Sequence, residues 1–157
     1  ANIVEHLDLI QYSDANSLDL KLVQLFYQID EDDKRFRDSD YAKNESKQIE
    51  LDKKNQEIID SLYNKYKSYI GISMVGKKFN HVMWEVIQHS NLGMMEKYLP
   101  VILKAVQNNE LNKTTFKMLI DRIYWQKYDF QIFGSQKGIR IADDKTRSEI
   151  IKKYGIE

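Results

Sequence analysis

His89 is the residue of this sequence best suited to acid–base chemistry. The chain has three histidines, and histidine is the side chain whose ordinary pKa lies closest to neutrality. His89 lies in the stretch EVIQHSN, at the flank of an apolar helical stripe that contains Val82 and Val86. That position fits either a general acid or base, or a hydrogen-bonded histidine in the core.

A carboxylate and a guanidinium four residues apart form a second candidate pair. On a helix over residues 18–37, with about 100° per residue, Asp33 falls inside the apolar stripe of Phe26 and Ile29. A buried carboxylate needs a partner, and Arg37 is spaced to supply one. The alternative is a solvated Asp33 in a fraying helix end.

Asp121 and Arg122 lie on a helix predicted over residues 112–128. This helix has apolar residues on two sides, which predicts burial from two directions. Asp121 and Arg122 point about 100° apart, so each is expected to reach a different partner. An arginine at such a place is suited to a bidentate contact with a carboxylate, and the pair could equally serve only to tie this helix to others.

The stretch FQIFGSQ, residues 130–136, follows as a loop with several polar groups. Gly134 permits backbone conformations that other residues avoid. The side chains of Gln131, Ser135 and Gln136 can cap carbonyl groups or bind a polar ligand. Gln88, beside His89, completes the predicted binding residues.

The elements that must position these residues are helices. One proline and six glycines permit long helices, and apolar residues recur at helical spacing over most of the chain. We predict an all-α fold, an irregular bundle of about six helices with an irregular glycine-containing loop before the last helix. Residues 69–79 are predicted as a loop, and Ile49 is placed on the buried side of a charged helix over residues 45–69. Residues 1–157 are predicted to form a single domain, with residues 1–17 as a loosely attached segment.

Composition excludes several classes of function. Lysine plus arginine and aspartate plus glutamate both number 24, so no nucleic-acid partner is expected. No apolar run reaches the roughly 20 residues that span a bilayer, so no membrane partner is expected. Cysteine is absent and neither a nucleotide-binding glycine motif nor HExxH occurs, so we expect no cofactor and no metal site. The chain begins ANIVEHL without methionine, which fits a cytoplasmic protein or an exported one whose signal peptide was removed.

Taken in order, these elements resemble the family of uncharacterised bacterial proteins catalogued as domain of unknown function 6624. That family's Asp-Gln-x-x-Arg corresponds to DKRFR (33–37), and its Gln-His-Ala-Asp to QHSN (88–91). Asp-Arg corresponds to residues 121–122, and Gln-x-Tyr-Gly-Thr-Gln to QIFGSQ (131–136). The resemblance implies that these polar groups form a set. It also implies that Asn91, where the family has aspartate, has lost a charge that matters if this carboxylate orients the histidine.

Three functions remain open. In an enzyme, most simply a hydrolase or transferase, His89 would be the acid or base and Asp121 or Asp33 would orient it. Arg122 would then bind an anionic group, while Gln131 and Gln136 would hold the substrate. The alternatives are a non-catalytic module that binds a small molecule or a peptide, and an interaction protein whose polar groups form a buried structural network. The oligomeric state is not fixed by the sequence.

Overall fold

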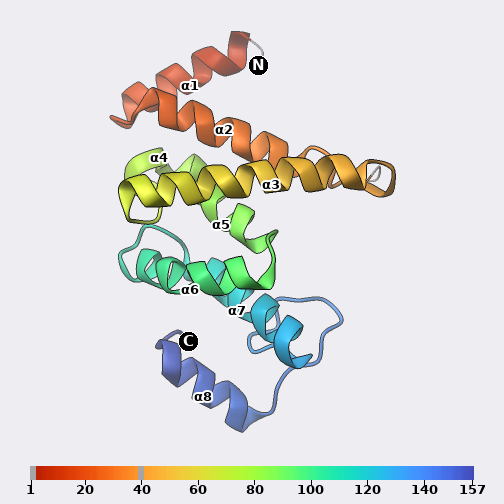
Figure 1. Ribbon diagram of the computed structural model, residues 1–157. Coiled ribbons are helices and arrows are strands. Elements are labelled where there is room, and N and C mark those ends of the chain that lie inside the picture. Colours follow the sequence, from red (N-terminus) through yellow and green to blue (C-terminus); the bar gives the residue numbers. More distant parts are fainter. Residues whose placement is uncertain (1–2, 39–40) are drawn as a thin grey trace. The chain divides into compact units, whose positions relative to one another are not determined.

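The computed structural model describes residues 3–38 and 41–157, and these residues form eight helices and no strand (Figure 1). Residues 1 and 2 of the predicted N-terminal segment lie outside the described residues. The helices are α1 (Ile3–Ala15), α2 (Leu20–Lys34), α3 (Tyr41–Tyr66), α4 (Ile72–Phe79), α5 (Val82–Gln88), α6 (Leu92–Gln107), α7 (Lys113–Tyr128) and α8 (Asp144–Tyr154). The predicted all-α class is confirmed. None of the described helices combines the length and the hydropathy that crossing a membrane requires.

The predicted count of about six helices is too low, chiefly because residues 69–79 are not a loop. Gly71 begins α4, and its carbonyl accepts hydrogen bonds from the amides of Met74 and Val75. Gly76 interrupts α4 with φ 75° and ψ 178°. The two glycines therefore mark a helix start and a kink rather than a loop. The helical stripe predicted around Val82 and Val86 lies on α5, which is separate from α4.

The chain divides into two compact units, Ala1–His89 and Ser90–Glu157. In the first unit, α2 packs against α1, α3, α4 and α5. Its apolar face buries Val23, Phe26 and Ile29, and α5 buries Val82, Met83 and Val86. The side chain of Asp19 caps α2 by accepting hydrogen bonds from the amides of Lys21 and Leu22. The apolar spacing of α2 is thus what turns one of its sides toward the core.

The end of α1 is held by one tyrosine. The hydroxyl of Tyr12 donates to the carbonyl of Val75 at 2.7 Å, and its ring meets that of Phe79 edge to face. The tyrosine lies so close to Gly76 that an added Cβ would come within 1.9 Å of its hydroxyl oxygen. Only glycine fits this approach together with the positive φ.

Helix α3 buries polar residues where apolar ones were predicted. Ile49 is 55% exposed, which makes its predicted burial wrong, while Gln48 and Asn55 are buried. Ile59 continues the same side of the helix and is fully buried. The reason is that this side meets the end of α2, where backbone carbonyl groups need donors.

The second unit is built on a pair of packed helices, α6 and α7. Tyr98 and Ile102 of α6 and Phe116 and Leu119 of α7 are buried. Asn112 caps the start of α7, and α8 ends at Gly155 in the left-handed conformation (φ 64°), as its sequence predicts. The predicted burial of α7 from two directions is incomplete, because Trp125 is 36% exposed. The two units are described separately, and the prediction of a single domain stays a prediction.

Candidate functional site

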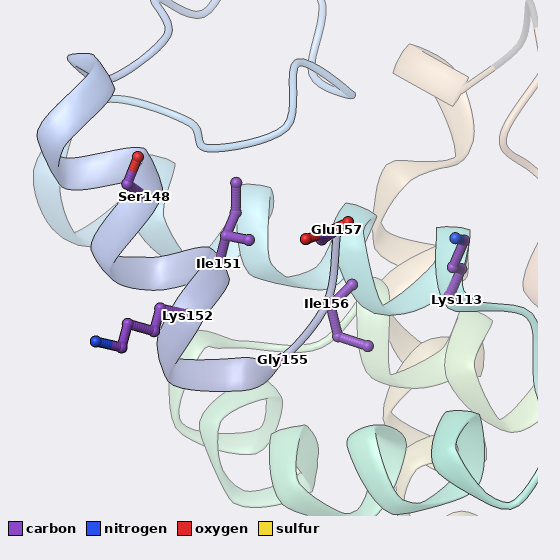
Figure 2. Close-up of a pocket in the computed structure, with 7 residues that line it drawn as sticks. All are labelled: Lys113, Ser148, Ile151, Lys152, Gly155, Ile156 and Glu157. Atoms are coloured by element: carbon purple, nitrogen blue, oxygen red, sulfur yellow. The ribbon is translucent and has the colours of Figure 1, made fainter.

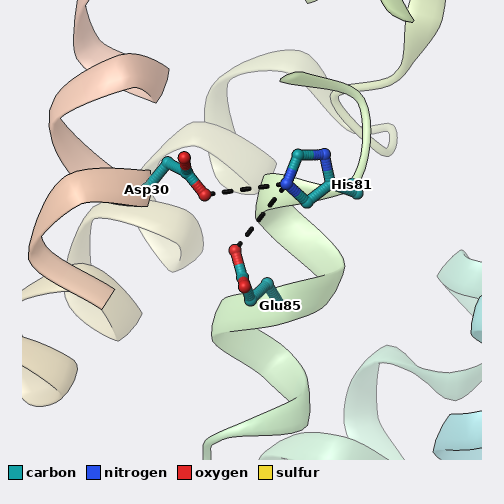
Figure 3. Close-up of side chains that lie close together, drawn as sticks. All are labelled: Asp30, His81 and Glu85. Atoms are coloured by element: carbon teal, nitrogen blue, oxygen red, sulfur yellow. Dashed lines mark ion pairs between the residues drawn. The ribbon is translucent and has the colours of Figure 1, made fainter. Parts of the chain in front are cut away.

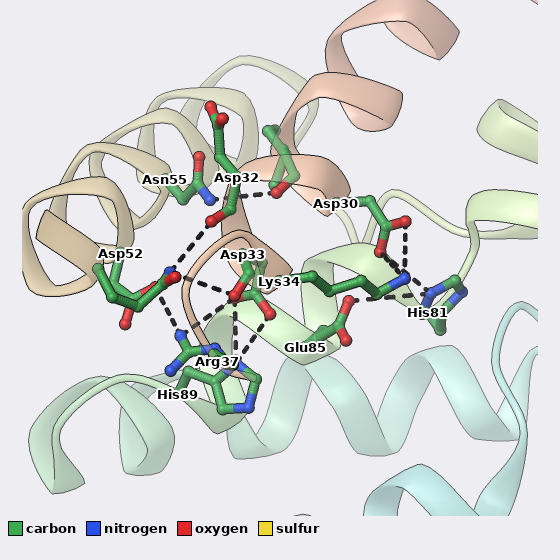
Figure 4. Close-up of polar contacts among 12 residues, drawn as sticks. Asp30, Asp32, Asp33, Lys34, Arg37, Asp52, Asn55, His81, Glu85 and His89 are labelled. Atoms are coloured by element: carbon green, nitrogen blue, oxygen red, sulfur yellow. Dashed lines mark hydrogen bonds and ion pairs between the residues drawn. The ribbon is translucent and has the colours of Figure 1, made fainter. Parts of the chain in front are cut away.

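Asp33 and His89 form the central contact of the candidate site (Figure 4). Asp33 lies in the last turn of α2, and its side chain is 2% exposed. His89 ends α5, and its ring nitrogen Nδ1 lies 3.0 Å from Oδ1 and 2.9 Å from Oδ2 of Asp33. The histidine side chain remains 23% exposed. A carboxylate at Nδ1 fixes the tautomer in which Nε2 is the proton acceptor.

Arg37 lies next to this pair. Its Nη2 is 3.6 Å from Oδ1 of Asp33 and 2.5 Å from Oδ1 of Asp52 on α3. The pairing of Asp33 with Arg37, predicted from their spacing, is therefore present. Asp52 was not among the predicted site residues.

Gln48 holds the end of α2 in place. Its Nε2 donates to the carbonyl oxygens of Asp32 and Asp33 and to Oδ1 of Asp52, and its Oε1 accepts from the amide of Phe36. Two turns further along α3, Asn55 donates to the carbonyl of Ile29. The last carbonyls of a helix lack their usual partners within it, so Gln48 supplies a donor where the end of α2 needs one.

A second group of charged residues lies beside the first on the same two helices. Asp30 of α2, His81 at the start of α5 and Glu85 of α5 converge (Figure 3). Nε2 of His81 is 3.6 Å from Oδ1 of Asp30 and 3.9 Å from Oε2 of Glu85, and Lys34 Nζ is 2.8 Å from Oδ1 of Asp30. On a helix, positions three or four apart lie on one side, so this group is stacked about one turn from Asp33 and His89.

The titration of this second group is strongly perturbed. Burial raises the pKa of Glu85 to about 7, and the charges of Asp33 and Asp30 act in the same direction. Burial also raises the pKa of Asp30, but hydrogen bonds from His81 and Lys34 outweigh it and bring that pKa down to about 2. The hydrogen bond with Asp30 raises the pKa of His81. Near neutral pH, Asp30 is therefore ionised while Glu85 is divided between its two forms.

In the second unit, Asp121 is fully buried and holds the loop that follows α7. Its Oδ1 accepts hydrogen bonds from the amides of Ile132 (2.8 Å) and Phe133 (2.7 Å). Its Oδ2 accepts from the amide (2.8 Å) and the hydroxyl (2.6 Å) of Ser135. Four donors from one short segment surround the carboxylate, so the segment is folded around it.

The glutamines of this loop complete the fold of the segment. Nε2 of Gln131 donates to the carbonyls of Gln136 and Ile139, and its Oε1 accepts from the amide of Gln136. The backbone of Gln131 forms a bridge with Ile141. Gly134 has φ 86°, the positive value that its place in the loop requires.

The structure thus brings the predicted residues together in two sets. Asp33, Arg37 and His89 are in contact in the first unit, where Gln88 is also buried. Asp121, Gln131, Ser135 and Gln136 are linked in the second unit, where Arg122 lies half-buried beside Asp121 on α7. Sequence reasoning missed Gln48, Asp52, Asp30, His81 and Glu85. The spacing of Gln48, Asp52 and Asn55, which puts three polar residues on one side of a helix, was a usable signal for part of that set.

The second unit also has an open hollow of about 610 Å³ (Figure 2). It lies at the end of α8 and is lined by Lys113, Ser148, Ile151, Lys152, Gly155, Ile156 and Glu157. No residue predicted for the site is among them. The charges of the two lysines and of Glu157 are of opposite sign, so the hollow does not favour an anion or a cation strongly.

Residues 27–155 match the model of a family described as a family of unknown function, DUF6624. The chain belongs to that family, as its motifs predicted. Neither the curated proteins nor the solved structures gave a significant match.

Proposed function

We propose that the protein is an enzyme in which His89 acts as the general acid and base of a hydrolysis or group-transfer reaction. The observation that supports this most strongly is the geometry of one histidine. Nδ1 lies 2.9 and 3.0 Å from the two oxygens of a carboxylate that is 2% exposed, while the ring itself is still 23% exposed. A histidine with one nitrogen fixed by a carboxylate and a ring that is partly accessible is suited to proton transfer.

The chemistry follows from these positions. Nε2 of His89 takes a proton from a water molecule or a substrate hydroxyl as that oxygen attacks, and returns it to the leaving group. The imidazolium formed in between is stabilised by the carboxylate of Asp33. Proton transfer by a positioned side chain typically contributes about 10²- to 10⁴-fold to the rate.

Asp33 is a positioning residue in this proposal, and its own position is well supported. Arg37 lies beside its carboxylate, and Gln48 binds its backbone carbonyl. A functional side chain needs such support, because a small displacement of the reacting atoms costs much of the rate.

Asp121 has a different role in the proposal. All four hydrogen bonds to its carboxylate come from residues 132–135, so we assign it to folding the loop rather than to orienting His89. Arg122, Gln131, Ser135 and Gln136 remain predicted ligand-binding residues, with Gly134 permitting the turn between them.

One observation favours the alternative, a structural or interaction protein without catalysis. The side chain of Gln48 uses both its amide nitrogen and its oxygen within the protein, as a network that only fixes a helix arrangement would. In that case His89 is one more member of the network and should contribute to stability. A module that binds a small molecule or a peptide without reaction is distinguished from an enzyme by turnover alone.

The experiment measures hydrolysis of a panel of activated carboxylic esters, phosphoric esters and amides. The proteins compared are the wild-type chain and the variants His89→Ala, Asp33→Asn and His6→Ala. We expect losses of about 10²- to 10⁴-fold for the first two variants and none for His6→Ala, whose histidine is exposed on α1. Unfolding free energies are measured in parallel. If His89→Ala keeps its activity, His89 is not the acid or base of the reaction. If no substrate turns over and the variant loses about 1–3 kcal/mol of stability, the structural alternative is correct.

A further inference from the structure

We propose that Asp30, His81 and Glu85 form a binding site for a divalent transition-metal ion such as Zn²⁺ or Mn²⁺. One imidazole nitrogen and two carboxylate oxygens would be the protein ligands. This proposal does not rest on the proposed function of His89, which lies about one helical turn away on the same side of α5.

The distances between the three side chains are close to what such an ion requires. One possible ligand atom from each residue lies within 4.8 Å of the others. With bonds of about 2.0–2.1 Å in a tetrahedral arrangement, neighbouring ligand atoms lie about 3.3 Å apart. The observed separations from Nε2 of His81 are 3.6 Å to Asp30 and 3.9 Å to Glu85, so small side-chain movements would complete the geometry.

The backbone already places the three residues. His81 and Glu85 are four residues apart at the start of α5, so they project from one side of it. Asp30 faces them from α2, which packs directly against α5. The apolar sides of these two helices are buried in the core, so the ligand-bearing sides are held in a fixed relation.

A second observation points to a bound cation. Oε2 of Glu85 is buried and has no hydrogen-bond partner among the described residues. A buried oxygen without a partner is costly, and a metal ion held by Glu85, Asp30 and His81 would remove that cost. The side chain of His81 makes no capping hydrogen bond, and its Nε2 lies near the carboxyl groups of Asp30 and Glu85, the other two ligand residues.

Lys34 is the cation now closest to this group. Its Nζ is 2.8 Å from both oxygens of Asp30, but its side chain is 54% exposed and can turn outward into solvent. It forms its ion pair with Asp30, and its charge also acts on Glu85. The imidazole ligand favours Zn²⁺, Mn²⁺ or Co²⁺ over Ca²⁺ and Mg²⁺, which prefer oxygen ligands alone.

The test titrates the full chain, first treated with a chelator, with Zn²⁺ by calorimetry and with Co²⁺ by visible absorption. We expect one ion per chain and a Co²⁺ spectrum that changes when nitrogen and carboxylate ligands bind. His81→Ala and Glu85→Gln should each weaken binding by about tenfold or more, since even outer-shell partners of a metal are worth that much. His6→Ala and His89→Ala are matched controls and should bind as the wild type does.

A further variant keeps the proposal testable if His81→Ala fails to fold. Lys34→Met removes a competing cation from an exposed position, so it should bind Zn²⁺ more tightly than the wild type. Three results would each overturn the proposal. The wild type binds neither Zn²⁺ nor Co²⁺, a folded His81→Ala binds Zn²⁺ as tightly as the wild type, or Lys34→Met shows no gain in Zn²⁺ affinity. Loss of hydrolysis in His89→Ala with metal binding intact separates the fate of this site from that of the proposed function.

Discussion

Replacing Asp121 by asparagine should destabilise the protein far more than the similar size of the two side chains implies. The carboxylate accepts two hydrogen bonds on each oxygen, from Ile132 and Phe133 on one side and from Ser135 on the other. An asparagine keeps one oxygen and presents an NH₂ group to the remaining pair of donors. Two hydrogen bonds are lost, and the two donor groups that then face the NH₂ group of asparagine are left buried without an acceptor.

The magnitude follows from the contacts. Hydrogen bonds to a charged group contribute about 1.5–3 kcal/mol each, so two of them give about 3–6 kcal/mol for Asp121→Asn. Ser135→Ala removes only the hydroxyl donor and keeps the amide, so it should cost about 1–2 kcal/mol. Glu149→Gln, a carboxylate-to-amide change at an exposed position of α8, serves as the control and should leave stability unchanged.

Urea unfolding followed by circular dichroism measures these differences, and amide hydrogen exchange locates them. In Asp121→Asn, the amides of residues 132–135 should lose protection before those of α7. A cost below about 1 kcal/mol, with protection of these amides unchanged, would refute the view that this carboxylate organises the loop.

Three further predictions concern single residues whose contacts are local. Gln48→Leu should lose about 2–4 kcal/mol of unfolding free energy, because it leaves the amide of Phe36 without its acceptor and removes one donor from each of two carbonyls of α2. An equal stability in urea would contradict this. Gly76→Ala should lower the thermal midpoint, because the new Cβ would collide with Tyr12. Adding Tyr12→Ala to that variant should recover part of the loss, and additive effects of the two changes would disprove the collision. Asn91→Asp should raise the thermal midpoint slightly, because Asn91 already caps α6 through Met94 and a negative charge suits that end of a helix; a lower midpoint would count against this capping role.

The residue at position 91 shows how the structure alters an interpretation based on sequence. The family motif raised the possibility that asparagine here means a lost catalytic charge. The side-chain oxygen of Asn91 accepts a hydrogen bond from the amide of Met94, and aspartate and asparagine perform that task almost equally well. The change is therefore compatible with an intact fold at the start of α6.

Local features of the fold were predictable from the sequence, and long-range polar contacts were not. The pairing of Asp33 with Arg37 depends on a four-residue spacing within one segment, so the sequence contained it. Apolar periodicity located α2, α7 and α8, and the glycine at position 155 marked the end of the last of these. Glycines at 71 and 76 misled the prediction of α4, because a helix start and a kink use the same residue as a loop.

The candidate metal ligands were beyond reach for a different reason. Asp30 lies on one predicted helix, and His81 and Glu85 lie on another far along the chain. Periodicity tells which side of each helix is apolar, but a charged residue at the edge of that side is as compatible with solvent as with a partner. Only the packing of α2 on α5 reveals that these three residues lie close together.

The polar row on α3 has a consequence for how this sequence tolerates length changes. Gln48, Asp52 and Asn55 meet specific groups at the end of α2, whereas apolar side chains can often repack after a shift. A single residue inserted between Gln48 and Asn55 would rotate everything after it by about 100°, and Asn55 would no longer face the carbonyl of Ile29. The polar contacts therefore allow α2 and α3 to pack in only one relative register. Relatives with the same contacts should lack insertions in this stretch of α3.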